Sequence, residues 1–123
     1  MAMPAVLYHF TCRDSHRMIG RYNCVLLPRS LWRVVWLTTE ALPDFEATGL
    51  GSVTPKCDRT QFRYVVTDLT HCRPWLGSPE RTALSADHLA TLEGYGDPEH
   101  WWISAEPVRA AWDRSYARAV AGA

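Results

Sequence analysis

The sequence predicts a small α+β domain with a core of about five strands and two or three helices. Two observations favour this class. Short β-rich segments bounded by Pro or Gly recur along the chain, and only a few stretches have helical spacing or a capping residue. The chain has 123 residues, a common size for one domain, and neither a linker nor a repeat divides it. Residues 1–123 are therefore expected to fold as a single domain.

Five segments have the composition of strands. Each is short, contains β-branched or aromatic residues, and ends near a Pro, a Gly or a polar turn. They are Ala5–Thr11, Asn23–Leu27, Arg33–Thr39, Gln61–Thr67 and His100–Ser104. The apolar run in the third segment is typical of a buried strand.

Three segments are expected to form helices. Asp14 or Ser15 is expected to cap a short helix that runs to about Met18 or Ile19 and is ended by Gly20, because glycine commonly follows the last helical turn. The segment Ser85–Leu92 begins with a good N-cap and places leucines three residues apart. The segment Val108–Val120 has apolar residues at helical spacing and is expected to be a terminal helix.

Pro and Gly mark two segments without predicted regular structure. The segment Leu42–Lys56 is expected to be a long loop, and a loop of this length in a compact domain usually has a function. The sequence leaves open whether it closes over a ligand. The segment His71–Pro79 is expected to be a turn region.

Charge and hydropathy restrict the partners and the location. The chain has 13 basic and 13 acidic residues, so its net charge gives no support for sequence-independent binding of nucleic acid, although a local arginine patch stays open. No run approaches the roughly 20 apolar residues of a membrane helix, and the first residues do not resemble a secretory signal. A cytoplasmic protein with reduced thiols is therefore expected.

Two other kinds of site are weighed and not favoured. A zinc-stabilised domain would use His9, Cys12, Cys57 and Cys72, but the four cysteines form no CxxC pair and the adjacent His71 and Cys72 are poorly spaced for one tetrahedral ion. No metal is therefore expected. A serine or cysteine hydrolase is disfavoured because no GxSxG sequence occurs.

Three short segments carry polar side chains suited to a ligand site. In YHFT, His9 and Thr11 lie on the same side of a strand, and WLTT ends an apolar strand with hydroxyl groups that include Thr38. In DPEHWW, Glu99 opens an aromatic strand, where a carboxylate suits proton abstraction or stabilisation of a developing cation. Each segment also has an ordinary explanation: a solvated strand face, the start of a loop, or a solvated loop acid.

Taken together, these segments resemble the DarT-like ADP-ribosyltransferases, an NAD-dependent class with a split β-sandwich core. The features in common are a Y-H-x-T strand, a short helix ending in Gly, a V-W-L-T strand and a late Glu that opens a strand. The resemblance implies that His9, with Thr11 beside it, contacts the ribose of NAD and that Thr38 lies near the nicotinamide. Trp36 is a candidate for stacking on a ring of NAD. Glu99 would be the catalytic acid.

The resemblance also implies an activity and partners. The activity is transfer of ADP-ribose to a macromolecular acceptor, single-stranded nucleic acid or protein, in a toxin–antitoxin or phage–host conflict setting with an antitoxin as a protein partner. Glu106 is a second candidate for the acid, and Glu99 is preferred because it opens the strand. The alternative function is a non-catalytic module that keeps the fold and binds a protein or nucleotide through a Trp-rich face, since the chain has 6 Trp.

Overall fold

Short strands make up most of the regular structure, as their β-branched and aromatic composition favours. The computed structural model describes residues 3–22, 24–25, 33–42, 61–94 and 96–116. In chain order the elements are β1 (Leu7–Thr11), α1 (Arg13–Tyr22), β2 (Cys24–Val25), β3 (Val35–Thr38), β4 (Phe62–Val66), β5 (Cys72–Pro74), α2 (Pro79–Thr82), α3 (Ala86–Glu93), the 3-10 helix η1 (Pro98–His100), β6 (Trp101–Ser104), β7 (Val108–Arg109) and β8 (Ala111–Trp112).

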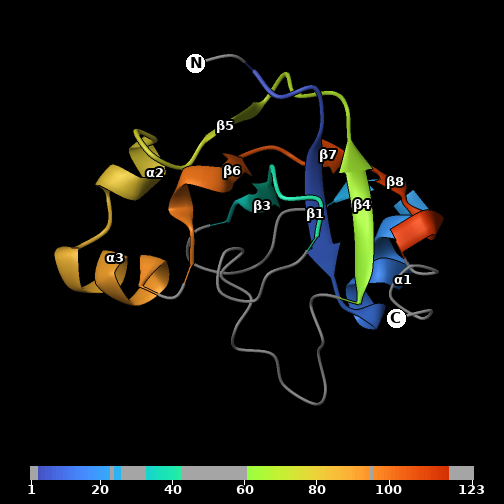
Figure 1. Cartoon of the computed structure of the whole chain (residues 1–123), viewed down its shortest axis with the longest axis horizontal. Helices are drawn as coiled ribbons and strands as arrows, with labels where there is room; N and C mark the ends of the chain where they lie inside the picture. Colours follow the sequence, from blue (N-terminus) through green and yellow to red (C-terminus); the bar gives the residue numbers. More distant parts are fainter. Residues whose placement is uncertain (1–2, 23, 26–32, 43–60, 95, 117–123) are drawn as a thin grey trace.

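The strands form an antiparallel sheet in the order β5-β6-β3-β1-β4-β8, with β2 and β7 paired as a separate ribbon. Figure 1 shows α2 and α3 beside the β6 end of the sheet and α1 at the opposite side, near β4 and β8. The described residues therefore form an α+β domain with a largely antiparallel sheet, which confirms the predicted class.

Two hydrophobic clusters lie on opposite faces of the sheet, because successive side chains of a strand point to opposite sides. The aliphatic core comprises Leu7, Ile19, Val25, Val35, Leu37, Tyr64, Val66, Cys72, Trp102, Val108 and Ala110. The tryptophan core comprises Val34, Trp75, Trp101 and Ile103, with Trp36, Leu84, Leu89 and Leu92 packed against it. Helix α1 and the β2–β7 ribbon contribute to the aliphatic core, whereas α3 covers the tryptophan core.

The predicted strands are present where the structure describes them, with ends shifted by at most two residues. The strand β5 is absent from the predicted list and lies inside His71–Pro79, a segment expected to be only a turn region. β5 lies at the edge of the sheet and includes Pro74, and an edge strand tolerates proline because one side of its backbone needs no partner. Most of the predicted loop Leu42–Lys56 lies outside the described residues.

Helix boundaries differ from the prediction at α1. This helix begins at Arg13 and continues through Gly20 to Tyr22, so the expected stop at Gly20 is wrong. A Cβ built at Gly20 would meet nothing within 4 Å, so no close approach requires glycine there. Burial of Ile19 in the aliphatic core stabilises this last part of the helix more than glycine weakens it.

Helix α3 is confirmed almost residue for residue. The hydroxyl of Ser85 accepts a hydrogen bond from the His88 backbone N–H at 3.2 Å, which is the predicted N-cap, and Gly94 is the C-cap. The preceding helix α2 is capped in the same way by Ser78 and has Pro79 at its first position. The sequence does not predict helix α2.

The predicted terminal helix Val108–Val120 is wrong over its first part. Val108–Arg109 and Ala111–Trp112 are strands, and burial alternates along them, with Val108 and Ala110 buried and Arg109 exposed. Pairing with β2 and β4 overrides the helical spacing of the sequence. A short helical turn follows Asp113, whose carboxylate accepts from the Ser115 N–H, and residues 117–123 lie outside the described part. Among the described helices, none is long and apolar enough to cross a membrane.

Candidate functional site at the β1–β3 junction

The three segments selected from the sequence lie on neighbouring strands. β6, β3 and β1 are adjacent in the sheet, and Thr38 pairs both with Tyr8 and with Trp101. The β1–β3 pairing is restricted to this single pair, whereas β1 and β4 pair over five positions. The sheet is therefore weakly joined between β1 and β3.

His9 lies at this weak junction. Its Nδ1 is 2.8 Å from the backbone carbonyl oxygen of Trp36, so a side chain replaces main-chain pairing between the two strands. Burial lowers the pKa of His9, and the carbonyl of Trp36 opposes this effect. Because a carbonyl only accepts, Nδ1 carries the proton, and the neutral ring presents Nε2 as a hydrogen-bond acceptor.

The predicted ligand residues divide between the two faces of the sheet. His9 pairs with Tyr64 of the aliphatic core, and Thr11 is on the same side of β1. Trp36 packs against the tryptophan core, and Thr38 is on the same side of β3 as Trp36. Neighbouring strands are brought together, but the side chains do not converge on a single face.

The two threonines are buried. Thr11 is 4% exposed and Thr38 is 5% exposed. The hydroxyl of Thr38 accepts from the backbone N–H of Glu40 at 3.1 Å, which stabilises the turn after β3. Thr38 therefore has a local structural partner.

Most of the described tryptophans pack in the interior. The ring of Trp36 is 4.8 Å from that of Trp75 and 5.8 Å from that of Trp101, centroid to centroid. Trp75, Trp101 and Trp102 are buried, and Trp112 is 37% exposed. A Trp-rich outer face is therefore absent from the described residues, and the side chain of Trp36 is only partly accessible.

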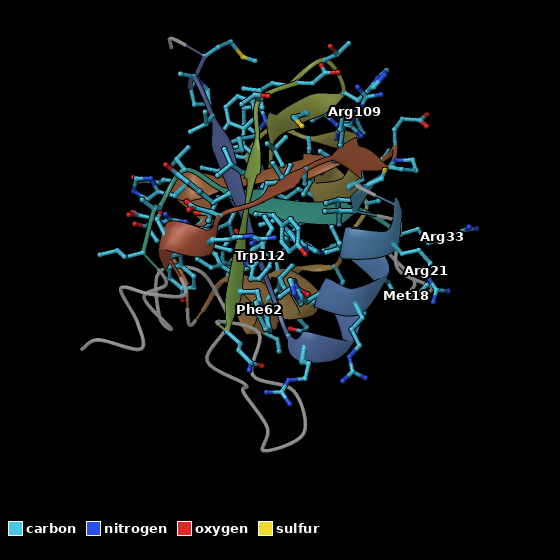
Figure 2. All side chains as sticks on the ribbon, turned by 90° about the vertical axis from the view of Figure 1, so that its right-hand side faces the viewer. Met18, Arg21, Arg33, Phe62, Arg109 and Trp112 are labelled. Carbon is cyan, nitrogen blue, oxygen red and sulfur yellow. The ribbon has the colours of Figure 1, made fainter. Side chains whose placement is uncertain are left out.

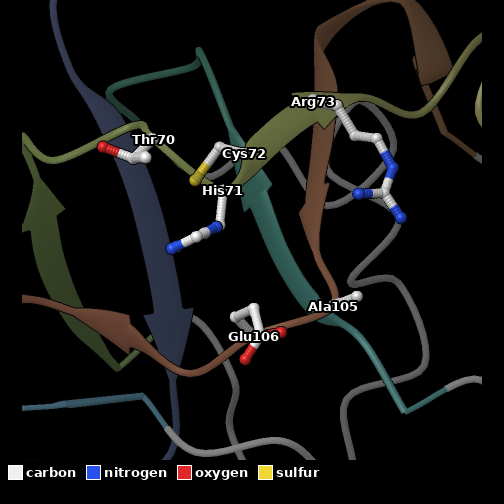
Figure 3. Close-up of a pocket in the computed structure, with 6 residues that line it drawn as sticks. All are labelled: Thr70, His71, Cys72, Arg73, Ala105 and Glu106. Carbon is white, nitrogen blue, oxygen red and sulfur yellow. The ribbon is translucent and has the colours of Figure 1, made fainter.

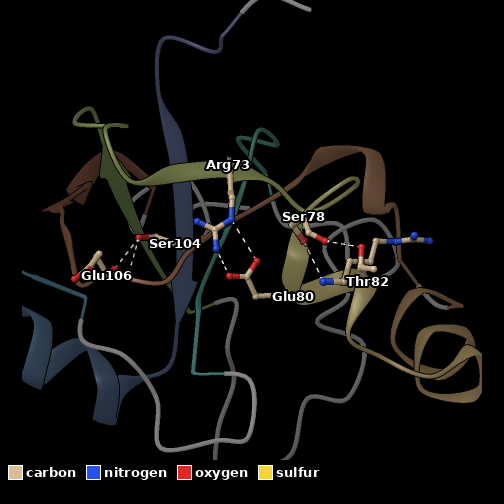
Figure 4. Close-up of polar contacts among 7 residues, drawn as sticks. Arg73, Ser78, Glu80, Thr82, Ser104 and Glu106 are labelled. Atoms are coloured by element: carbon tan, nitrogen blue, oxygen red, sulfur yellow. Dashed lines mark hydrogen bonds and ion pairs between the residues drawn. The ribbon is translucent and has the colours of Figure 1, made fainter.

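Glu99 and Glu106 occupy opposite ends of β6. Glu99 lies in η1 and its side chain is exposed. Glu106 follows β6 and lines an open cavity of about 380 Å³ together with Thr70, His71, Cys72, Arg73 and Ala105 (Figure 3). The backbone of Glu106 is held by Ser104, whose hydroxyl donates to its carbonyl at 2.8 Å and accepts from its N–H at 3.1 Å (Figure 4).

Few of the side chains that line this cavity offer an unpaired charge to a ligand. Arg73 forms an ion pair with Glu80, also shown in Figure 4, and burial raises the pKa of the Cys72 thiol. The thiol is therefore protonated near neutral pH and is a weak nucleophile. His71 and Glu106 remain the exposed ionisable side chains of the cavity.

A cluster of ligand-type side chains occurs where β3 ends and β6 begins. His100 Nε2 lies 3.3 Å from a carboxylate oxygen of Glu40 and 3.3 Å from one of Asp97. The other ring nitrogen, Nδ1, is 2.8 Å from the hydroxyl of Thr39. The sequence carried a signal for this cluster, since both DPEHWW and the residue after WLTT place polar groups at strand ends, but the pairing of β3 with β6 was needed to bring them together.

The residues that a zinc-stabilised domain would use are not gathered at the cluster around His100. His9 Nδ1 is engaged by Trp36, the sulfur of Cys12 lies 4.0 Å from the Ser15 hydroxyl, and Cys57 is outside the described residues. Within the described part of the chain, the group of side chains with metal-ligand spacing is Glu40, Asp97 and His100.

A cationic and aromatic surface covers the opposite side of the molecule. Helix α1 exposes Arg13, Arg17 and Arg21, which share one helix face because they are four residues apart. Figure 2 shows Arg21 and Met18 on this helix, with Trp112 and Phe62 beside it. The further members of this arginine–aromatic surface are Arg109 and Arg114, whose guanidinium lies 4.7 Å from the Trp112 ring.

Comparison of the chain with protein-family models, with curated proteins and with solved structures finds no match.

Proposed function

We propose that this chain is an NAD-using ADP-ribosyl-transfer domain, with the β1–β3 junction as the NAD site. The observation that carries the proposal is the position of His9. It bridges two neighbouring strands of the six-stranded sheet that are otherwise joined by one residue pair. The motif segments YHFT and WLTT lie on the two sides of this junction.

The protonation state of His9 suits a ribose contact. A neutral ring whose Nδ1 donates to Trp36 keeps Nε2 as an acceptor, and ribose hydroxyls are donors. Transfer requires cleavage of the bond between nicotinamide and ribose, and a carboxylate stabilises the positive charge that develops on the ribose. Glu99 is the acid that the resemblance implies, and Glu106 competes with it because it lines a cavity.

We further propose that the chain binds nucleic acid along the arginine–aromatic surface. Three arginines on one helix face suit contacts with backbone phosphates, and an exposed Trp112 offers a stacking surface for an unpaired base. Among the described residues, none of the carboxylate ion pairs involves Arg13, Arg17 or Arg21. These guanidinium groups are therefore available to a phosphate.

The test is a thermal-shift titration with NAD, because a ligand that binds only the folded state raises the melting temperature. The wild type is expected to shift at millimolar NAD, and His9→Ala is expected to lose the shift measured against its own ligand-free melting temperature. The matched control is His88→Ala on the exposed face of α3, which should retain the shift. Absence of a shift in the wild type would refute the proposal.

The catalytic acid is identified by turnover. Glu99→Gln and Glu106→Gln are compared for release of nicotinamide at equal NAD occupancy. Loss of turnover in Glu99→Gln alone supports the family pattern, and loss in Glu106→Gln alone assigns the acid to the cavity at the other end of β6. Full turnover in both variants would exclude both acids.

One observation favours a second function, a binding module without catalysis. The ligand candidates His9 and Trp36 point to opposite faces, and Glu99 is exposed away from the buried junction. Such a module would bind nucleic acid through the arginine–aromatic surface, not through a Trp-rich face. It predicts nucleic-acid binding with neither an NAD shift nor nicotinamide release.

A further inference from the structure

We propose that Glu40, Asp97 and His100 form a binding site for a divalent metal ion of the zinc class, where the end of β3 lies beside η1. This inference is independent of NAD binding. It rests on the positions of the three side chains, whose ligand atoms all lie within 4.8 Å of one another.

The two spacings from His100 Nε2 to the carboxylate oxygens match the edges of a tetrahedral ligand set. Imidazole nitrogen and carboxylate oxygen bind zinc at about 2.0–2.1 Å, and a tetrahedron with bonds of that length has edges of about 3.3–3.4 Å. The two distances from His100 Nε2 to the carboxylates are both 3.3 Å. An octahedral ion such as magnesium, with bonds of about 2.0–2.1 Å, sets neighbouring ligands closer, at about 2.9 Å.

The imidazole is held in the orientation that a metal ligand needs. The Thr39 hydroxyl lies 2.8 Å from His100 Nδ1, and the Thr39 backbone N–H donates to the His100 carbonyl at 3.1 Å. These contacts direct Nε2 toward the two carboxylates. Metal-binding histidines usually have such a partner on the other ring nitrogen, so Thr39 is the positioning residue of the site.

The charge and exposure of the site also fit a divalent cation. In the described part of the chain, the ion-pair contacts of Glu40 and Asp97 are those with His100, so no arginine neutralises either carboxylate there. The two carboxylates balance the charge of a divalent ion. The three side chains are 37–41% exposed, which leaves a fourth ligand position open to water.

Calorimetric titration of the metal-free chain with zinc chloride tests the proposal. One ion is expected to bind per chain, and His100→Ala and Thr39→Val should each lower the affinity by about tenfold or more. Substitution of His88, an exposed histidine on α3, is the matched control and should not change the affinity. Circular dichroism of each metal-free variant separates loss of binding from loss of folding.

Cobalt substitution distinguishes this site from one that uses the thiols. Cobalt bound by nitrogen and oxygen shows only weak visible bands, whereas thiolate ligation adds an intense near-ultraviolet band. Failure of the wild type to bind zinc, unchanged affinity in His100→Ala, or a thiolate band in the cobalt form would each overturn the proposal.

Discussion

The two sides of this molecule have opposite electrostatic character. Helix α1 exposes three arginines beside Trp112, whereas Glu40, Asp97 and the exposed Glu99 lie where β3 ends and β6 begins. The formal net charge of zero conceals this separation. Net charge alone therefore says little about a local binding surface, and the position of each charge in the fold decides whether a phosphate or a cation can bind.

The origin of the two surfaces also differs. The arginine stripe is local, because helical geometry alone aligns Arg13, Arg17 and Arg21. The carboxylate–histidine cluster is non-local, because Glu40 and His100 meet only through the register of β3 and β6. A change that shifts the pairing of β3 with β6 should therefore disrupt the carboxylate–histidine cluster and leave the arginine stripe intact.

The largest expected effect comes from removing the arginine stripe. Replacing Arg13, Arg17 and Arg21 together by Gln should weaken binding of single-stranded nucleic acid about a hundredfold or more near 50 mM salt. The slope of log affinity against log salt should fall by about 2, since each phosphate contact contributes about 0.7. Fluorescence anisotropy with a labelled oligonucleotide measures both quantities.

The control for this charge removal lies at the opposite edge of the sheet. Arg73→Gln removes a positive charge from β5 and should leave oligonucleotide affinity almost unchanged, because that arginine is paired with Glu80. If Arg73→Gln weakened binding as much per charge as the triple variant does, the arginine–aromatic surface would not be the binding face.

A smaller effect is expected on the pH dependence of stability. The pKa of His9 is lowered by burial, so the unfolded state binds more protons than the folded state as pH falls below the ordinary histidine value of about 6.5. This histidine thus destabilises the fold progressively below about pH 6.5, by up to about 1.4 kcal/mol per pH unit. Urea unfolding of His9→Gln should give a flatter profile between about pH 6.5 and 5. An unchanged slope would contradict the assigned neutral state.

A second, lower pH window is expected from the C-terminal turn. The hydroxyl and backbone of Ser115 and the Arg63 guanidinium lower the pKa of Asp113. The folded state is then favoured above the ordinary aspartate value, and this contribution disappears as pH falls through the lowered pKa. Destabilisation by His9 therefore begins at a higher pH than the loss of the Asp113 contribution.

The smallest predicted effect concerns the cap of α3. Ser85→Ala should lower the free energy of unfolding by about 1 kcal/mol, because the His88 N–H loses its acceptor. Thr91→Ala, in the exposed middle of the same helix, is the control and should cost little, since alanine is the better helix former. Equal losses in the two variants would contradict the capping role of Ser85.

Local features of the sequence were sufficient for part of the fold. Strand composition located β1, β3, β4 and β6, and the serine at position 85 located the start of α3. Helical spacing misled at Val108–Trp112, where pairing with β2 and β4 favours strands. The sequence did not predict β5, because Pro74 lies within it and proline argues against a strand. The strand forms nevertheless, since it lies at the edge of the sheet, where proline is tolerated.

The candidate site shows the same division. The sequence by itself determined that His9 lies within a strand, that Thr11 and Thr38 lie at strand ends and that Glu99 precedes a strand, because turn residues and β-branched runs act within a few positions. Only the tertiary structure decided that β1, β3 and β6 are neighbours, that His9 and Trp36 face opposite cores, and that Glu40 reaches His100. Strand order, register and facing depend on contacts between residues far apart in the chain, and a local sequence pattern does not encode those contacts.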